Sequence, residues 1–467
     1  MTDATLGTAA QLRDPNWTPP LSRAVPLGIQ HVLAMFVSNV TPAIIVCGAA
    51  GVGFGSDNIG PMLYMIQMSM LFAGIATLLQ TIGFGPVGAR LPIVQGTSFA
   101  FLPIMIPLVA GRGVEAFPAL FGGIVAGGLF HAMLGTVIGR IRFALPPLVT
   151  GLVVTMIGLA LVKVGIEYAA GGVPAKGQPE YGSLLNWSVA GTVILVTLGL
   201  KFYARGMLSV AAVLIGLLAG YVLAWALGMV SFAAVGRAAV FSAPMPFSFG
   251  IEFTAAAIIG FCLMAFVSAV ETVGDVSGIC KGGAGREATD REIAGATYAD
   301  GFGTAIAGMF GALPNTSFSQ NVGLIAMTGV MSRHVVTIGA LFLIVCGLMP
   351  KVGAIISTVP IVVLGGGVIV MFGMVVAAGI SMLSDVNWNR RNMVIFAVAL
   401  SLGLGLQLEP QALQHLPESV RILATSGILP AALIAIVLNL VLPEELAAEA
   451  TEEVSGGLSG HGTGRLS

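Results

Sequence analysis

Long apolar stretches follow one another along almost the whole chain, separated by short polar connections. Segments 61–82, 116–138, 207–229 and 419–442 carry few or no charges, and each has the length of about 20 residues that a helix needs to cross a bilayer. The pattern predicts about fourteen membrane segments, which start near residues 25, 61, 89, 116, 143, 186, 207, 250, 290, 312, 334, 352, 392 and 419. The short alternating segments of a β-barrel are not visible. We therefore expect an all-α polytopic membrane protein.

Composition and charge support this expectation. Of the 467 residues, 56% are hydrophobic and 9% are charged, whereas about a quarter of the residues are charged in soluble domains. If the N-terminus is cytoplasmic, 14 of the 20 Lys and Arg residues lie on the inner side, as the positive-inside rule requires. We expect a multi-pass protein of the plasma or inner membrane, with cytoplasmic tails at 1–24 and 443–467.

Four short motifs recur in the second half of the chain in the same order. FVS, GFG, TSF and VVTMIG at 36–38, 83–85, 97–99 and 153–158 reappear as FVS, GFG, TSF and VIVMFG at 266–268, 301–303, 316–318 and 368–373. The offsets of 230, 218, 219 and 215 residues favour a duplication. Because each copy would hold seven spans, the two copies must enter the membrane from opposite sides. The sequence thus predicts two inverted repeats, which are typical of secondary transporters.

The third and tenth spans, LPIVQGTSFAF (91–101) and LPNTSFSQNVG (313–323), occupy equivalent places in the two repeats. Each is interrupted by Pro, Gly, Ser and Thr, and proline disfavours helix at and before its own position. Extended backbone at membrane depth survives only where it pairs with protein or lines a cavity. We expect each span to form a short strand followed by a half-helix, starting near Phe99 and near Gln320. Their positive N-terminal ends would face a shared ligand.

Acidic residues inside predicted spans are candidates for function, because a carboxylate in hydrocarbon costs at least about 2.5 kcal/mol. Glu271 follows a long apolar run, and Asp275 lies one helical turn later on the same face. Asp300 lies in the ninth span. For all three we predict a substrate or proton role, and the structural alternatives are a carboxylate at a helix end and helix–helix pairing.

Polar and aromatic side chains in the broken spans complete the candidate site. Gln320 and Asn321 carry planar amides, which suit a flat heterocycle with alternating N–H and C=O groups. Ser319 and Thr97 lie in the same two broken spans. Two phenylalanines could sandwich such a ring, although core packing is the commoner role of a Phe; they are Phe99 and Phe318.

His31 follows Gln30 in the first span. A lone membrane histidine is more often a hydrogen-bonded packing residue than a site residue. No motif of an ATP motor, a zinc protease or a lipase-type hydrolase is found, and the cysteines lack metal-ligand spacing. We expect no enzyme activity, no metal, no cofactor and no nucleic-acid partner.

The stretch QNVGLIAMTG (320–329) resembles the signature of the nucleobase-ascorbate transporter family, Gln/Glu-Asn-x-Gly followed by Thr. It is joined by Gln30-His31, GTSFAF (96–101) and ETVGD (271–275), so that the resemblance covers residues 25–441. It implies a core domain formed by 25–138 and 250–350, and a gate domain formed by 139–249 and 351–442. It also implies a homodimer that forms largely through the gate domains.

In bacterial members similar to this chain, the activity is proton-coupled uptake of a nucleobase. The resemblance implies that Glu271 binds substrate and couples the proton, that Gln320 binds substrate, and that the backbone N–H of Phe99 contacts the base. It implies stacking by Phe318 and supporting roles for His31 and Asn321.

Uracil carriers of the family tend to have Glu and His where this chain has Gln320 and Asp275, which favours xanthine or uric acid as substrate. An elevator-like movement of the core against the gate is the expected mechanism, with sodium as a possible replacement for the proton. The alternatives are a symporter of uracil or another nucleobase, an anion exchanger of the same fold, and, with less support, a membrane enzyme or a channel.

Overall fold

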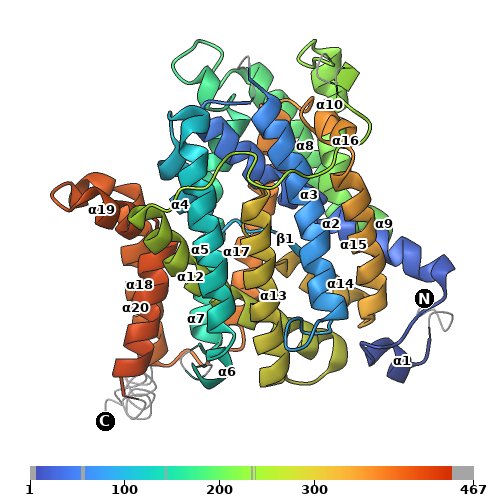
Figure 1. The fold of residues 1–467 in the computed structure, drawn as a ribbon, viewed down its shortest axis with the longest axis vertical. Helices are drawn as coiled ribbons and strands as arrows, with labels where there is room; N and C mark the ends of the chain where they lie inside the picture. Colours follow the sequence, from blue (N-terminus) through green and yellow to red (C-terminus); the bar gives the residue numbers. More distant parts are fainter. Residues whose placement is uncertain are drawn as a thin grey trace, which may run out of the picture.

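The computed structural model describes residues 7–443, except 54–57, 142, 144, 233, 234 and 237. Helices that run mostly along the long axis surround one small sheet near the centre (Figure 1). The first half contains α1 (Ala9–Arg13), α2 (Leu21–Ala50), α3 (Gly60–Ile82), β1 (Gln95–Thr97), α4 (Leu102–Val109), α5 (Phe117–Leu134), α6 (Ile138–Ile141), α7 (Pro147–Ala169), α8 (Leu184–Tyr203), α9 (Met207–Val210) and α10 (Ala212–Ala226). The second half contains α12 (Ala255–Ile279), α13 (Asp290–Met309), β2 (Asn315–Ser317), α14 (Ser319–Thr328), α15 (Arg333–Gly347), α16 (Pro350–Ile356), α17 (Ile361–Leu383), α18 (Arg390–Leu408), α19 (Glu418–Ala424) and α20 (Ile428–Val441).

Each predicted membrane segment has a counterpart in this list. Within the described residues, eight helices are long and apolar enough to cross a membrane, and α15 with α16, bent by 87°, would form a ninth. The other segments are the shorter apolar helices α10 and α20, the more polar α13, and the two broken spans β1–α4 and β2–α14. The predictions of about fourteen segments, and of short strands in the third and tenth, are confirmed.

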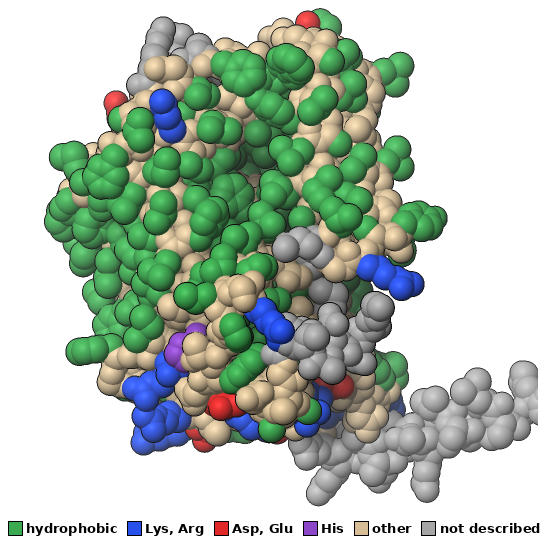
Figure 2. Space-filling view, turned by 90° about the vertical axis from the view of Figure 1, so that its right-hand side faces the viewer, with side chains coloured by type: hydrophobic (Ala, Val, Ile, Leu, Met, Phe, Trp, Pro, Cys, Tyr) green, Lys and Arg blue, Asp and Glu red, His purple; other side chains and the backbone are tan. Residues whose placement is uncertain are grey.

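The outer surface is predominantly apolar. Figure 2 shows a face covered largely by hydrophobic side chains, with most of the visible Lys and Arg gathered toward the end that carries α1. Large side chains such as Phe202 on α8 and Val222 and Trp225 on α10 are exposed. An exposed apolar surface of this extent is unfavourable in water, as expected for a protein that spans a membrane.

The helices pack in two groups. In one group, α7, α8 and α10 pack with α17, and α18 packs with α20 and α7; in the other, α2, α3 and α15 pack together, as do α5, α12 and α13. Glycines permit the closest approaches: a Cβ added to Gly365 would lie 2.1 Å from the backbone N of Ala169, and one added to Gly301 would lie 2.1 Å from that of Ala132. Small residues at helix crossings are typical of membrane bundles.

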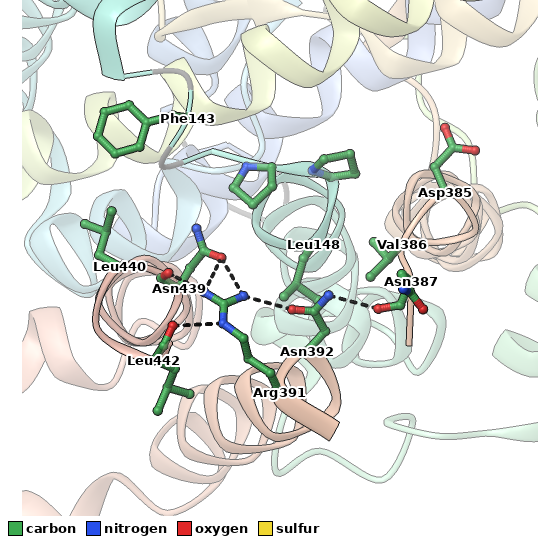
Figure 3. A pocket seen from close by; sticks show the side chains of 12 residues that line it. Phe143, Leu148, Asp385, Val386, Asn387, Arg391, Asn392, Asn439, Leu440 and Leu442 are labelled. Carbon is green, nitrogen blue, oxygen red and sulfur yellow. Dashed lines mark hydrogen bonds between the residues drawn. The ribbon is translucent and has the colours of Figure 1, made fainter. Parts of the chain in front are cut away.

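Arg391, at the start of α18, caps the C-terminal end of α20. Its guanidinium donates to the backbone carbonyls of Asn439, at 2.5 Å, and Leu442, at 3.0 Å (Figure 3). The last carbonyls of a helix have no partner within the helix, and a basic side chain stabilises them. A pocket of about 470 Å³ lies beside this contact, between the ends of α7, α17, α18 and α20.

Candidate functional site

The two broken spans meet as a buried antiparallel pair of strands. Gln95 pairs with Ser317 and Thr97 with Asn315. Two further bonds extend the pairing, from Ser98 N to Pro314 O at 2.8 Å and from Phe318 N to Val94 O at 3.0 Å. The N–H and C=O groups of the extended backbone are thus hydrogen-bonded within the protein, as we expected for extended backbone at membrane depth.

A half-helix follows each strand. α14 begins at Ser319, beside the predicted start at Gln320, but α4 begins at Leu102 rather than near Phe99. Residues 99–101 instead form a turn in which Leu102 N donates to Phe99 O at 3.1 Å. Pro103 then occupies the first turn of α4, where a missing N–H costs least.

A small cavity lies beside the strand pair and the first turn of α14. Its lining residues are Thr97, Phe99, Ile157, Glu271, Thr316, Ser317, Phe318, Ser319, Gln320 and Val375. All five predicted substrate-binding residues and Thr97 are therefore brought together. The cavity measures about 20 Å³, which is room for roughly one water molecule. A purine would need a more open arrangement of the surrounding helices.

Glu271, on α12, lines the cavity and has one carboxylate oxygen without a hydrogen-bond partner in the described part of the chain. The side chain is 8% exposed, and Oε2 makes no hydrogen bond with the residues that the structure describes. A buried acceptor left unpaired costs about 1–3 kcal/mol. This oxygen is therefore available to a donor on a ligand, or to a proton.

Asp275, one turn further along α12, is fully buried and fully bonded. Its two carboxylate oxygens accept hydrogen bonds from the hydroxyls of Ser317 and Ser319, both at 2.7 Å. Asp275 is not among the described residues that line the cavity. It fixes β2 and the first turn of α14 against α12, and so it positions the cavity wall.

Asp300, on α13, lies behind β1. It is fully buried and accepts from Gln80 Nε2 at 2.8 Å, Gln95 Nε2 at 2.6 Å and Thr272 Oγ1 at 2.5 Å. These contacts join α3, β1, α12 and α13. They match the alternative of helix–helix pairing, and in the described part of the chain Asp300 does not reach the cavity lining.

His31 and Asn321 join α2 to α14. Nδ2 of Asn321 lies 3.0 Å from Nδ1 of His31 and donates to the backbone carbonyl of His31 at 3.2 Å. Both side chains are buried, as is the neighbouring Gln30. None of the three is found among the described lining residues. His31 and Asn321 therefore hold the half-helix α14 against α2 without lining the cavity. For the side chain of Gln30, no hydrogen bond is found with the described residues.

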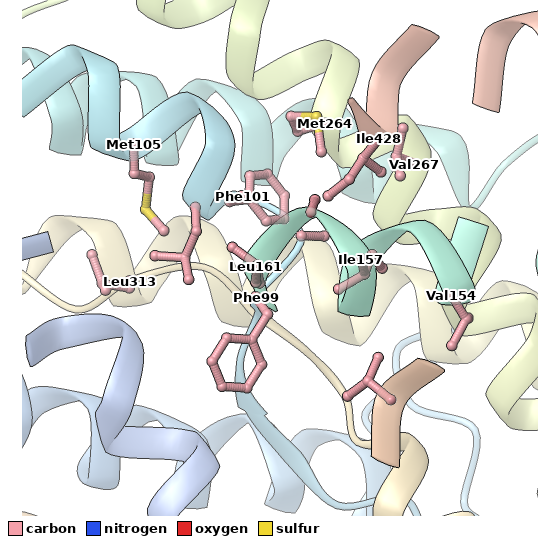
Figure 4. Close-up of a cluster of buried hydrophobic side chains, with 14 of the residues drawn as sticks. Phe99, Phe101, Met105, Val154, Ile157, Leu161, Met264, Val267, Leu313 and Ile428 are labelled. Carbon is pink, nitrogen blue, oxygen red and sulfur yellow. The ribbon is translucent and has the colours of Figure 1, made fainter. Parts of the chain in front are cut away.

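The two candidate aromatic rings are engaged in packing. Phe99, 7% exposed, packs edge to face on Phe372 of α17 with ring centroids 5.1 Å apart, and it lies close to Ile157 of α7 (Figure 4). Phe318, 4% exposed, packs its ring with Val32 and Met35 of α2. Both residues line the cavity, and stacking of either ring on a base stays a prediction.

Several residues that shape the site were not predicted. Asn39, on α2, accepts from Thr97 N at 2.9 Å and donates to Ser69 O at 3.2 Å. Asn39 is a polar residue in an apolar span. The rule that polar or charged residues within a membrane span are candidates for function would therefore have found it. Ile157 and Val375, which close the cavity from α7 and α17, are apolar residues in apolar helices and carry no such signal.

A larger cavity adjoins the candidate site. It measures about 380 Å³ and shares Ser319, Gln320 and Val375 with the small cavity. Its other lining residues come from α2, α8, α10, α14 and α17, and we call it the vestibule; they are Ala34, Lys201, Val213, Gly323, Leu324, Met374 and Ala378. Its volume lies within the range of about 300–1,000 Å³ that is usual for small-molecule pockets.

The model of the Permease family matches residues 22–412. The chain belongs to this family, the nucleobase-ascorbate transporters. It is 36% identical over 437 residues to the uric acid permease PucJ of Bacillus subtilis, covering 91% of this chain and 95% of that protein. It is 34% identical over 446 residues to the xanthine permease XanP of Escherichia coli, covering 91% and 93%. The expected assignment to this transporter family, rather than to an enzyme, is confirmed.

Solved structures match the fold at low sequence identity. The transmembrane domain of the cyanobacterial bicarbonate transporter BicA aligns with a TM-score of 0.58 and 15% identity, over 90% of this chain and 98% of that domain. The murine anion transporter SLC26A9 aligns with a TM-score of 0.58 and 12% identity, over 90% of this chain and 68% of that chain. These domains have the inverted-repeat fold, so the fold predicted from the repeated motifs is confirmed.

Proposed function

We propose that this permease is a secondary active transporter that takes up a purine base, with xanthine or uric acid as its substrate and the proton as its coupling ion. The relatives that bear the names of uric acid and xanthine permeases align over about nine-tenths of this chain. One observation carries the proposal: Glu271, whose Oε2 has no hydrogen-bond partner among the described residues, and Gln320 line the same cavity at the start of a half-helix.

The chemistry of this cavity complements an oxopurine. The edge of such a base alternates N–H donors with C=O acceptors. A carboxylate accepts, an amide side chain both donates and accepts, and the first N–H groups of a helix have no partner within the helix. Glu271 would bind a ring N–H, Gln320 would form a paired contact, and the start of α14 would donate to a carbonyl.

Alternating access would follow from movement between the two packing groups. In the elevator-like scheme, α2–α5 and α12–α15 form the core that carries the site, and α7–α10 with α16–α20 form a gate that supplies Ile157 and Val375. Proton binding at Glu271 would remove a buried charge before the core moves, which lowers the cost of moving it through the membrane. Cytoplasmic termini and a homodimer formed through the gate complete the proposal.

Substitution of Glu271 tests the coupling. Purified protein in proteoliposomes, with the outside more acidic, should accumulate radiolabelled xanthine, and Glu271→Gln should abolish the accumulation. The matched control is Glu180→Gln, because Glu180 is exposed on the loop before α8. Undiminished accumulation by Glu271→Gln would rule out Glu271 as the coupling group.

Gln320→Glu tests the choice of base. The new carboxylate can accept but no longer donate, so the preference among xanthine, uric acid and uracil should change, or binding should be lost. Unchanged affinity for every base would remove Gln320 from the site.

An anion exchanger is the second candidate, because the two structural neighbours are named as bicarbonate and anion transporters. Competition of labelled xanthine by sulfate rather than by uric acid would favour it.

A further inference from the structure

The vestibule lies between the two packing groups, next to the candidate site. α2 and α14 form one wall, and α8, α10 and α17 form the other. The vestibule shares Ser319, Gln320 and Val375 with the small cavity. It therefore offers a path by which a ligand could enter or leave the small cavity that Glu271 lines.

Lys201 gives the vestibule its charge. Lys201 lies near the end of α8, and among the described residues that line the vestibule it alone carries a charge. The remaining lining side chains are apolar, apart from Ser319 and Gln320. Lys201 makes no salt bridge with any part of the chain that the structure describes. Its side chain is exposed, and a positive charge that lines a cleft with low-dielectric walls raises the local concentration of anions there.

We infer that Lys201 is a specificity-determining residue that favours ionised oxopurines over neutral purines in the vestibule. This inference rests on the proposed function. Uric acid is a weak acid that is mainly a monoanion at neutral pH, whereas hypoxanthine is mainly neutral. The two bases share the fused ring system and the carbonyl at C6, whereas uric acid has two further carbonyls at C2 and C8. Because each variant is compared with the wild type for both bases, a change in the ratio of affinities reports the charge that uric acid carries. The ammonium group acts by charge, so an arginine at this position would preserve the preference.

A competing role for Lys201 is anchoring at the lipid surface. Long basic side chains near helix ends extend their charged groups toward lipid headgroups. Such a role would affect the protein in the same way for every substrate. The ratio of two affinities, measured on the same preparation, therefore separates the two roles.

The test compares binding of uric acid and hypoxanthine at neutral pH to purified wild type, Lys201→Gln and Lys201→Arg in detergent. Lys163→Gln is the control, because Lys163 is an exposed lysine on α7 that lies outside the described vestibule lining. We expect Lys201→Gln to weaken uric acid binding about fivefold, the factor that a unit charge about 4 Å away provides in bulk water, with hypoxanthine binding unchanged. Lys201→Arg and Lys163→Gln should keep the wild-type ratio, and added salt should reduce the ratio only where the positive charge remains.

Equal weakening of both bases by Lys201→Gln, or no change in either, would overturn the inference while leaving the proposed function intact. Wild-type protein that bound neither purine would overturn both. A preference for uric acid that is insensitive to salt in the wild type would also count against an electrostatic role.

Discussion

Replacement of Gly96 by alanine should disturb the site by steric clashes with Phe318 and Met35. Gly96 is the middle residue of β1, and a Cβ placed there would lie 2.3 Å from Cε2 of Phe318 and 2.7 Å from Cε of Met35. Ordinary contact begins at 3.4 Å, so the Phe318 ring must retreat by 1.1 Å, the difference between 3.4 and 2.3 Å. That ring is buried against Val32 and Met35, and overpacking of this kind costs about 1–3 kcal/mol.

The displacement should affect transport as well as folding. Phe318 is the residue immediately before α14, so a shift of its ring moves the first turn of the half-helix, which carries Gln320. Misplacement of a binding group by about 1 Å can cost about 100-fold in rate. We expect Gly96→Ala to reduce xanthine uptake in proteoliposomes by 10- to 100-fold, and to lower the thermal midpoint in detergent by an amount equivalent to about 1–3 kcal/mol.

Two further variants decide whether the contact is the cause. Gly373→Ala, in α17, is the matched control because its new Cβ would have nothing within 4 Å. Combining Gly96→Ala with Phe318→Leu should recover thermal stability, since the smaller side chain removes the clash. Wild-type uptake and stability in Gly96→Ala would refute the reasoning.

Three other substitutions probe the polar contacts behind the site. Asp300→Ala should destabilise the protein by about 3 kcal/mol or more, because Gln95 Nε2, Gln80 Nε2 and Thr272 Oγ1 all lose their carboxylate acceptor. Asp300→Asn keeps one acceptor and should therefore cost less. Thermal unfolding in detergent measures the difference between the two variants. Asn321→Asp should reduce uptake at least tenfold, because its carboxylate would face the carbonyl oxygen of His31 that the amide now binds; uptake at the wild-type rate would contradict this contact. Arg333→Ala should lower the thermal midpoint by an amount equivalent to about 1–2 kcal/mol, because its guanidinium donates to the carbonyls that end α3, and an unchanged midpoint would show that water replaces it.

Much of the architecture could be predicted from local properties of the chain. The spacing of apolar segments predicted the fourteen spans, and the Pro, Gly, Ser and Thr residues within 91–101 and 313–323 indicated which two spans would break. Proline and glycine act on their own backbone, so the breaks could be located without a partner. The start of α4 was predicted three residues too early, because the turn at 99–101 depends on a local hydrogen bond that helix propensity does not reveal.

The division of roles among the acidic residues required the fold. Glu271, Asp275 and Asp300 look alike in sequence, as carboxylates within apolar spans. Their partners lie far away along the chain: Asp275 bonds two serines 42 and 44 residues on, and Asp300 bonds a glutamine 220 residues before it. Glu271 lines the cavity, and one of its carboxylate oxygens has no hydrogen-bond partner among the described residues.

The sequence by itself determined that the chain crosses the membrane many times, that two of its spans break, and that acidic residues lie within apolar spans, because hydrophobicity and backbone propensity belong to the residues themselves. Only the tertiary structure decided which acid lines the cavity, how the rings of Phe99 and Phe318 pack, and that Ile157 and Val375 close the cavity while Lys201 lines the vestibule beside it. Those properties depend on contacts between segments hundreds of residues apart, and no local pattern specifies which segments will meet.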